Sequence, residues 1–402
     1  MWYTTRELQP IYSLRTMINR TLSHPTWLEL NARALAHNIE RFKAIIPPRA
    51  HVAVVVKANA YGHGLEQIGS LLDSNDHVSY LLVATLDEAI RLRKQGVSKS
   101  ILIVNPVRTD TDIAADYQVD LMVTDTDILD AMNNAARQVN KQLNIHLKVD
   151  TGLSRFGYHP DQIPELITLI TNEYPHLIIK GLYTHFAESN NSDLSYTQWQ
   201  QDQFSALIDR LVQAGITIPL IHYANTAATT SLKHHPAINF FRIGAGAYGI
   251  WPSESTRSDN WLPEDCPNLK LVACWKTRIV HIKQVPAGTF VGYNRTYRTN
   301  REATIGIIPV GYYDGFDKRL SNKGGVHING QTAPIIGTIG MNATMIDISH
   351  IPSVHLDSEV TLMGRHPMVT PYDLAHQTGC FNPRQIFTQI NPLIPRVVVA
   401  QE

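Results

Sequence analysis

The sequence predicts an α/β protein in which an N-terminal (β/α)8 barrel of the TIM type precedes a C-terminal mostly-β domain. Three observations lead to this prediction: eight short apolar runs before about residue 245, helix-compatible stretches between most of them, and a change of texture after about residue 262. The length of 402 residues exceeds what one core usually contains, which also favours two domains. A doubly wound open sheet is the competing fold for the N-terminal part.

The eight runs are rich in β-branched and apolar residues and do not alternate with polar ones. Such continuous runs are typical of strands that are buried on both faces, as in parallel sheets. The predicted strands are residues 52–57, 80–84, 101–105, 121–124, 145–149, 181–186, 219–224 and 240–244.

Two of the stretches between these runs show clear helical spacing. Residues 86–96 (LDEAIRLRKQG) have apolar positions three and four apart and end in a glycine. Residues 195–215 form a longer stretch with the same kind of ending. A glycine at this place is a common C-terminal cap, so both stretches are predicted to be helices.

The C-terminal part of the sequence consists of strand-like runs separated by Gly, Pro and Asn, without long helical patterns. Such a sequence pattern is typical of a β domain. These runs are residues 271–285, 303–312, 325–328, 333–340 and 344–349. A polar stretch rich in turn formers, 251–267, is the predicted boundary. The predicted organisation is therefore an N-terminal extension over 1–25, a barrel over 26–258 and a β domain over 259–402.

Composition excludes several classes of function. There are 35 basic and 35 acidic residues, so the sequence has no excess of positive charge with which to bind nucleic acid or an anionic membrane. No apolar run approaches the length of a membrane span, and the first 20 residues are too charged for a signal peptide. The three cysteines lack metal-ligand spacing, so no metal is expected and a cytoplasmic location fits best.

Several predicted strands end in polar residues, and the carboxyl ends of barrel strands are where active sites form. One such residue is usually structural, but a series of them on one rim indicates a site. The series comprises Lys57, Lys148, Asp150, His185, His222, Asn225 and Arg242.

Lys57 is the strongest candidate for a functional residue among these, because it directly follows four apolar residues. Desolvation would depress the pKa of its amine and free it to form a Schiff base with an aldehyde. An ordinary strand-end lysine that reaches solvent is the alternative. The glycine-rich segments 222–228 and 242–249 lie where barrels often bind phosphate.

The motifs at these positions resemble the alanine racemase family over roughly residues 26–396. VVKANAYGHG (55–64) resembles the segment that carries the cofactor lysine of that family. The other matching motifs, in the family's order, are LKVDTGLSRFG (147–157), YTHFA (183–187), HYANTAA (222–228), FFRIGAGAYG (240–249), GYYDG (311–315) and IGMNATMID (339–347).

The resemblance implies an enzyme that interconverts L- and D-alanine with pyridoxal 5′-phosphate and supplies D-alanine for peptidoglycan. Lys57 would carry the cofactor, and Lys57 and Tyr293 would be the two catalytic bases, on opposite faces of the substrate Cα. The other residues expected at the cofactor are Tyr61, His185, Asn225, Thr226, Arg242, Ile243, Gly244 and Tyr248. His222 would hold Arg242, whose lasting positive charge makes the cofactor ring a weaker electron sink.

The same resemblance implies a homodimer with shared active sites. Tyr293, Tyr312 and Met341 would enter the site of the partner subunit. Arg155 would steer the substrate carboxylate, and a carbamate on Lys148 would orient Arg155. The alternative for Lys148 is that Asp150 lies between these two cations.

Thr226 stands where the family usually has Ser, and the chain departs from the family pattern at three further places. Asn342 replaces an Asp, Asn294 replaces a Gly, and Pro392 stands where some members have a Tyr. These changes leave a serine or broader small-amino-acid racemase as an alternative. Two other functions are possible. A barrel-type decarboxylase using the same cofactor would need an acidic partner for the pyridine nitrogen, where this chain has Arg242. A non-catalytic cofactor carrier would not need a second base such as Tyr293.

Overall fold

The structure is a computed structural model that describes residues 25–251 and 268–400. The chain divides into two compact units. The barrel unit comprises Leu30–Ala273, Cys380–Gln389 and Val398–Glu402, and the β unit comprises the remaining segments, chiefly Cys274–Gly379. The expected extension over 1–25 lies outside the described residues except for Pro25, as does the expected boundary at 258.

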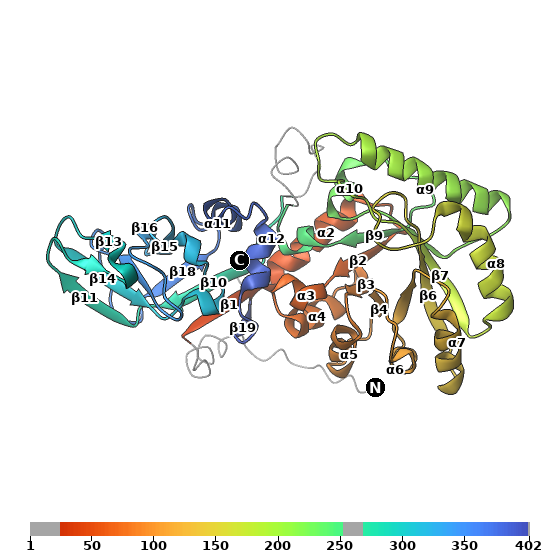
Figure 1. The fold of residues 1–402 in the computed structure, drawn as a ribbon, viewed down its shortest axis with the longest axis horizontal. Coiled ribbons are helices and arrows are strands. Elements are labelled where there is room, and N and C mark those ends of the chain that lie inside the picture. The colour runs from red at the N-terminus through yellow and green to blue at the C-terminus, as the bar shows by residue number, and fades with distance from the viewer. Residues whose placement is uncertain (1–24, 252–267, 401–402) are drawn as a thin grey trace, which may run out of the picture. The chain divides into compact units, whose positions relative to one another are not determined.

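The barrel unit is built on an eight-stranded parallel sheet (Figure 1). Its strands are β2 (His51–Val55), β3 (Val78–Val83), β4 (Ser100–Ile103), β5 (Asp120–Val123), β6 (Leu143–Lys148), β7 (Leu177–Tyr183), β8 (Leu220–His222) and β9 (Phe240–Ile243). Neighbours in the sheet follow chain order, and β2 also pairs with β9. Backbone bonds from Asn239 N to Ile221 O (3.2 Å) and Arg242 N to Ala224 O (3.0 Å) close the circle between β8 and β9. The predicted barrel is confirmed, and the open sheet is wrong.

Each strand is buried because it has the barrel interior on one face and helices on the other. Ala53, Tyr80, Leu82, Leu102, Leu220 and Phe240 form one cluster of the core. In Figure 1, helices α7 (Leu129–Gln138), α8 (Ile163–Glu173) and α9 (Ser195–Gln213) lie along the outer side of the strands. The remaining helices of the unit are α2 (Ala32–Ile45), α3 (Lys57–Tyr61), α4 (Leu65–Asp73), α5 (Leu86–Lys94), α6 (Thr111–Asp116), α10 (Thr226–Ser231) and α12 (Pro383–Gln389).

The two helices predicted from spacing are confirmed as α5 and α9. Thr85 begins α5, since its hydroxyl accepts a hydrogen bond from the amide of Glu88. Gly96 and Gly215 follow the two helices at φ of +93° and +75°, the left-handed region that glycine enters without steric cost.

The β unit contains a six-stranded sheet in the order β16-β15-β18-β10-β1-β19, a three-stranded sheet in the order β11-β14-β17, and the hairpin β12-β13. The strands are β1 (Thr26–Asn31), β10 (Ala273–Arg278), β11 (His281–Val285), β12 (Phe290–Val291), β13 (Tyr297–Arg298), β14 (Ala303–Ile308), β15 (Gly325–Ile328), β16 (Gln331–Pro334), β17 (Thr344–Asp347), β18 (Glu359–Met363) and β19 (Arg396–Val399). Helix α11 (Pro371–Thr378) begins at Thr370, whose side chain exchanges hydrogen bonds with Asp373.

Two predicted strands of the β unit differ from the structure. The run 271–285 is two strands, because β10 pairs with β18 and β11 pairs with β14 of another sheet. The run 333–340 is extended only to Pro334, where β16 ends. None of the helices in the described ranges is long and apolar enough to cross a membrane.

Candidate active site

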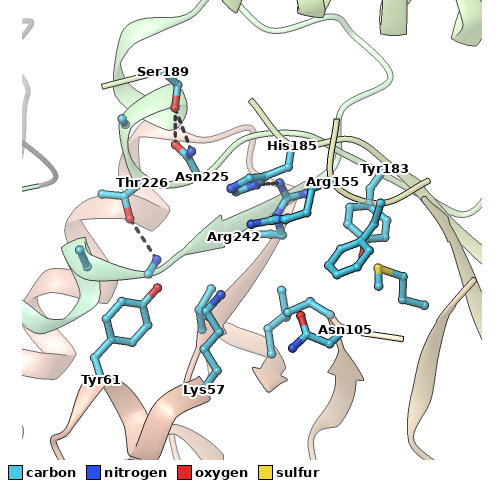
Figure 2. A pocket seen from close by; sticks show the side chains of 18 of the residues that line it. Lys57, Tyr61, Asn105, Arg155, Tyr183, His185, Ser189, Asn225, Thr226 and Arg242 are labelled. Carbon is cyan, nitrogen blue, oxygen red and sulfur yellow. Dashed lines mark hydrogen bonds between the residues drawn. The ribbon is translucent and has the colours of Figure 1, made fainter. Parts of the chain in front are cut away.

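A cavity of about 260 Å³ opens at the carboxyl ends of the barrel strands (Figure 2). Five of its lining residues are lysine or arginine, and none of its lining residues is acidic. The basic residues are Lys57, Lys148, Arg155, Arg242 and Arg384. Such a cavity suits a ligand with several negative charges, because cations this close together repel one another until an anion lies among them.

Lys57 does not end its strand, as the apolar run suggested, but begins α3 directly after it. Four successive residues, from Ala58 to Tyr61, have φ between +52° and +55°. Non-glycine residues avoid this left-handed conformation at a cost of about 1–2 kcal/mol each. A tight left-handed turn therefore follows Lys57, and the surrounding structure must hold it.

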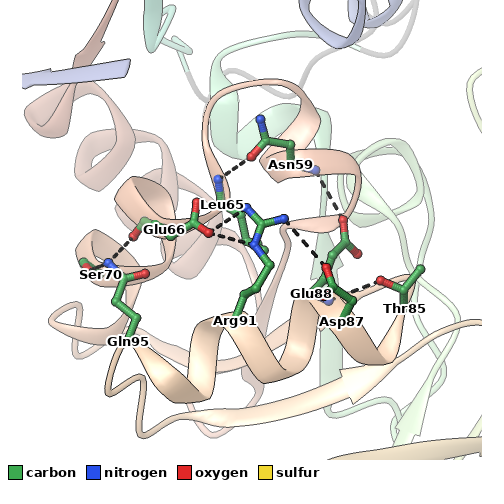
Figure 3. A network of polar contacts seen from close by, with 9 residues as sticks. All are labelled: Asn59, Leu65, Glu66, Ser70, Thr85, Asp87, Glu88, Arg91 and Gln95. Atoms are coloured by element: carbon green, nitrogen blue, oxygen red, sulfur yellow. Dashed lines mark hydrogen bonds and ion pairs between the residues drawn. The ribbon is translucent and has the colours of Figure 1, made fainter. Parts of the chain in front are cut away.

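Two side chains hold this turn by accepting hydrogen bonds from backbone amides (Figure 3). The buried carboxylate of Glu88 accepts from the amides of Asn59 (3.3 Å) and Ala84 (2.9 Å), which joins the turn to the end of β3. The side chain of Asn59 accepts from the amide of Leu65 (2.8 Å), at the start of α4. An ion pair between Arg91 and Glu66 (2.6 Å) and a hydrogen bond from Gln95 to Ser70 (2.7 Å) join α4 to α5 on the exposed side. The turn that follows Lys57 is therefore held in place by α4, α5 and the end of β3.

The environment of Lys57 favours the neutral amine. Burial lowers its pKa, and the positive charges of Arg155, Arg242 and Arg384 lower it further. The Glu88 carboxylate opposes this shift. A neutral lysine amine is a nucleophile and a proton acceptor.

Three groups on one side of the cavity form a small polar cradle. The hydroxyl of Thr226 accepts hydrogen bonds from the amides of Gly244 (3.0 Å) and Gly246 (3.4 Å), so its own proton is left to donate into the cavity. The hydroxyl of Tyr61 points to the same place (Figure 2), and burial raises the pKa of this phenol, so it too stays a donor. A Cβ on Gly244 would lie 2.8 Å from the Tyr61 hydroxyl oxygen. Only glycine keeps this cradle open.

Asn225 shapes the neighbouring rim of the cavity. It is the N-cap of α10, since its side-chain oxygen accepts from the amide of Ala228 (3.0 Å). The same side chain exchanges hydrogen bonds with Ser189. Asn225 is therefore fixed at the start of the helix that presents Thr226.

Arg242 lies across the floor of the cavity with its guanidinium tied down. It donates to Nδ1 of His222 (2.7 Å), to Nδ1 of His185 (3.0 Å) and to the carbonyl oxygens of Thr184 and Tyr223. Burial lowers the pKa of Arg242 to about 10, which leaves it charged at neutral pH. Burial and the Arg242 charge hold the pKa of His185 and of His222 well below the usual range, so both imidazoles are neutral.

Lys148 is a second buried amine, at the end of β6. Burial, with the nearby charge of Arg242, lowers its pKa to about 7. Its amine donates to the carbonyl of Val149 (2.7 Å) and lies over the ring of Tyr183. Asp150 instead accepts from the amides of Gly152 and Ser154, and in the described residues no ion pair joins it to Lys148 or Arg155. The Asp150 charge nonetheless raises the pKa of Lys148, in opposition to Arg242 and Arg155, so the alternative in which Asp150 separates these two cations stays a prediction.

Two of the residues expected at the cofactor, Ile243 and Tyr248, lie behind the cavity, as does His222, which was expected only to hold Arg242. Ile243 belongs to the β9 ladder, and His222 backs Arg242. Tyr248 is fully buried, and its hydroxyl donates to the carbonyl of Val55 (2.8 Å) while its ring packs on that of Tyr61. Direct contact of Tyr248 with a cofactor is therefore not supported, because the hydroxyl is already engaged and the ring lies behind Tyr61. Its position supports Tyr61 instead.

The remaining expected residues lie in the β unit. Tyr293, Met341 and Asn342 line one surface pocket there, and Tyr312 is exposed. The side chain of Tyr293 is 73% exposed. Asn294, where the family has a glycine, takes φ of +58°, a left-handed conformation that asparagine tolerates better than most residues.

Several lining residues were not predicted from the sequence. The polar ones are Asn105 after β4, Tyr183 at the end of β7, Ser189, Asn190, and Arg384 in α12. Asn105 and Tyr183 stand at strand ends, which is a signal that could have found them. Nothing near Arg384 in the sequence indicates that α12 belongs to the barrel unit.

Comparison with known proteins agrees with this geometry. The family description "Alanine racemase, N-terminal domain" matches residues 30–252, and "Alanine racemase, C-terminal domain" matches residues 272–398. The chain is 34% identical over 382 residues to an alanine racemase of Halothermothrix orenii, covering 94% of this chain and 98% of that one. It is 32% identical to an alanine racemase of Methanococcus maripaludis, with 94% and 99% covered.

Solved structures show the same likeness. An alanine racemase of Clostridium difficile superposes with a TM-score of 0.86 at 29% identity, covering 94% of this chain and 97% of that one. An alanine racemase of Bacillus anthracis with bound L-Ala-P gives a TM-score of 0.84 at 31% identity, with 94% and 96% covered. Sequence and structure agree over nearly the whole chain, so this protein belongs to the alanine racemase family and is an isomerase that racemises alanine.

Proposed function

We propose that the chain interconverts L- and D-alanine by a two-base mechanism with pyridoxal 5′-phosphate attached to Lys57. The observation that carries this proposal is the desolvated amine of Lys57 in a cationic cavity without acidic lining residues. The proposal also places the enzyme in the cytoplasm, where its D-alanine would serve peptidoglycan synthesis.

The residues of the cavity fit this cofactor. A phosphate group matches the cradle of Tyr61, Thr226 and Gly244, which offers two hydroxyl donors and no side chain that would block it. The amine of Lys57 is suited to attack an aldehyde, because its pKa is lowered. The guanidinium of Arg242 would face the pyridine nitrogen, and His185 would lie against the ring.

The chain's own residues would then handle the proton and the substrate. Pyridoxal phosphate supplies an electron sink for the pair left on Cα when the α-proton is removed. The Lys57 amine would accept or return this proton on one face of Cα. Arg155, the cavity cation with the strongest effect on the pKa of Lys57, would hold the substrate carboxylate. Arg242 would keep its own proton, which limits the electron sink and discourages side reactions.

The second base would be Tyr293 of a second copy of the chain. Its phenol is 73% exposed and lines a surface pocket with Met341 and Asn342, so it is available to another subunit. Inversion needs proton donors on both faces of Cα, and the barrel cavity offers Lys57 on one. A homodimer with shared sites supplies the other.

A broader substrate range is the second candidate. Asn342 is exposed beside Met341 and bears no charge where the family has an acid. Loss of that negative charge relaxes the environment of a bound amino acid, which favours serine as an additional substrate.

Product analysis and chemical trapping test the proposal together. Purified protein supplied with pyridoxal phosphate and L-alanine is expected to form D-alanine until the two enantiomers are equal. Borohydride reduction of the loaded enzyme is expected to fix the pyridoxyl group on the peptide that contains Lys57. A label on another lysine, or a product other than D-alanine, overturns the assignment.

Mixing of inactive variants tests the shared site. Lys57→Ala and Tyr293→Ala protomers should each be inactive as homodimers. A heterodimer of the two contains one site with both bases, so activity is expected to return after subunit exchange. No recovery in verified heterodimers would place both bases on one chain.

A further inference from the structure

Arg242 is a buried cation without a carboxylate in contact. The residue is 4% exposed. Its guanidinium donates to four acceptors, which are two neutral imidazoles and two carbonyl oxygens. Among the ion pairs of the described residues, none involves Arg242. A buried charge is costly unless an opposite charge or aligned dipoles compensate it.

A chain of hydrogen bonds leads from Arg242 through the barrel to an acid. Nδ1 of His222 accepts from Arg242 (2.7 Å), and Nε2 of His222 lies 3.2 Å from Nδ1 of His146. Nε2 of His146 lies 3.4 Å from Oδ2 of Asp120, the first residue of β5. All four side chains are buried. This path crosses from β9 through β8 and β6 to β5.

The barrel is shaped to admit the ring of His146. Gly181 of β7 is its register partner, and a Cβ at Gly181 would collide with the imidazole. The ring of His222 is likewise held in one plane, stacked on Tyr183 at 4.6 Å and packed against Phe240 at 4.5 Å. Both imidazoles therefore have fixed orientations.

The direction of every bond in the chain follows from its first member. Arginine can only donate, so Nδ1 of His222 must accept. A neutral imidazole then carries its proton on Nε2 and donates it to Nδ1 of His146. By the same reasoning His146 carries its proton on Nε2 and donates to Asp120. Three successive N–H groups point from the cation toward the acid, and such an aligned chain polarises each of its members.

Asp120 has the further partners that a buried carboxylate needs. The hydroxyl of Tyr80 donates to its Oδ2 (3.2 Å), and the side-chain amide of Asn144 donates to its Oδ1 (3.0 Å). These donors satisfy both carboxylate oxygens of Asp120 at the far end of the chain.

We propose that Asp120 and His146 are positioning residues for the racemase reaction: through His222 they give Arg242 a remote carboxylate counter-charge and fix the guanidinium in the cavity. This inference rests on the proposed placement of Arg242 beside the cofactor ring. No bond breaks and no proton leaves its nitrogen in this role. The relay keeps Arg242 charged and aligned in a site that has no acidic lining residue.

The test compares two substitutions of His146 with similar volume. In His146→Gln, the amide oxygen can accept from His222 and the amide nitrogen can donate to Asp120, so the relay is preserved. In His146→Leu the relay is cut. Because cutting the relay removes hydrogen bonds that act on a charged group, kcat is expected to fall about 10- to 100-fold in His146→Leu. KM is expected to change little. His146→Gln is expected to restore most of that loss, and Asp120→Asn to lose kcat as His146→Leu does.

Imidazole ¹⁵N spectra of the cofactor-free and loaded protein give a readout independent of activity. His222 and His146 of the wild type are both expected to carry the proton on Nε2. Because Arg242 still donates to its Nδ1, His222 should keep this tautomer in both variants, but its Nε2–H should keep a hydrogen-bonded chemical shift in His146→Gln and lose it in His146→Leu. A proton on Nδ1 of His222 in the wild type overturns the relay whether or not any variant folds.

The kinetic comparison can also overturn it. Equal losses of kcat in His146→Gln and His146→Leu, with both variants folded, would show that His146 only fills the barrel. Absence of racemase activity in the wild type would overturn the proposed function but leave the spectra to decide on the relay.

Discussion

The hydroxyl of Tyr61 lies 2.8 Å from the point that a Cβ on Gly244 would occupy. The two residues come from opposite ends of the barrel sequence, after β2 and after β9, which are neighbours in the sheet. Between them and Thr226 the backbone leaves a space that a single methyl group would fill. The cradle proposed for phosphate thus depends on the absence of a side chain at one position.

Gly244→Ala is expected to weaken binding of pyridoxal phosphate about 10- to 100-fold, because the added methyl displaces the Tyr61 hydroxyl, and a hydrogen bond to a charged group contributes about 1.5–3 kcal/mol. The affinity of cofactor-free protein, measured by absorbance or fluorescence titration, checks this. Tyr61→Phe serves as the matched variant, since it removes the same donor without adding bulk. The idea fails if Gly244→Ala binds as wild type does while Tyr61→Phe is weakened.

The second prediction concerns the sign of charge effects on Lys57. Its pKa is lowered by burial and by Arg155, and is raised by Glu88. Attachment of the cofactor needs the neutral amine, so Arg155→Met should move the pH midpoint of attachment upward, and Glu88→Gln should move it downward. The measurement is the rate of covalent attachment to cofactor-free protein as a function of pH.

Arg384→Met is the control for this pair, because Arg384 contributes the smallest of the charge effects on Lys57. Its shift is expected to have the same sign as that of Arg155→Met and a smaller size. Midpoints that move the same way in Arg155→Met and Glu88→Gln would contradict an electrostatic origin.

The third prediction follows from the pKa of about 7 for Lys148. The folded-state value lies below the unfolded value of 10.5, so the unfolded chain binds more protons between these two pH values. The free energy of unfolding of cofactor-free, carbonate-free protein should therefore rise with pH across this window and be lowest below it. A pKa change of one unit corresponds to about 1.4 kcal/mol, so the total contribution is a few kcal/mol. Urea unfolding at a series of pH values measures it.

Lys148→Met is expected to flatten that pH dependence, and an unchanged slope in this variant would assign it to other groups. The neutral amine of Lys148 can also add CO2, forming an N–C bond and releasing one proton, which gives the carbamate expected from the family. Its negative charge would attract Arg155 and Arg242. A carbamate resonance with ¹³C-bicarbonate, missing in Lys148→Met, would demonstrate this group.

The strands of the barrel could be predicted because strands buried on both faces are continuous apolar runs, and such runs are visible without any tertiary information. The polar residues at their ends could be found by the same pattern. The left-handed turn after Lys57 could not, since Ala58 and Ala60 have no intrinsic preference for positive φ and adopt it only because Glu88 and Asn59 hold the turn. Local sequence does not encode that bracing.

Arg384 and Asp120 were missed for a different reason. Arg384 belongs to a helix that follows most of the β unit in sequence, yet packs in the barrel unit. Asp120 stands at the amino end of its strand, whereas the prediction considered only carboxyl ends. Both residues acquire their place through contacts between segments that are distant in sequence, and neither lies in a motif. Roles that depend on such contacts need the three-dimensional structure.

The last prediction addresses the two bases. Lys57 and Tyr293 should each serve one enantiomer, because each can reach only one face of the planar Cα carbon. By the family resemblance, Lys57 serves D-alanine and Tyr293 serves L-alanine.

In deuterated water, Tyr293→Phe should therefore retain exchange of the α-proton of D-alanine, lose that of L-alanine, and racemise very slowly. Loss of a general base typically costs about 10²- to 10⁴-fold, so the asymmetry between enantiomers is expected to be large. Mass spectrometry of each enantiomer after separation measures it, and Tyr313→Phe is the control for removal of another exposed phenol of the β unit. Equal losses for both enantiomers in Tyr293→Phe would mean that Tyr293 positions the substrate or cofactor, and the base for the second face would have to be another residue.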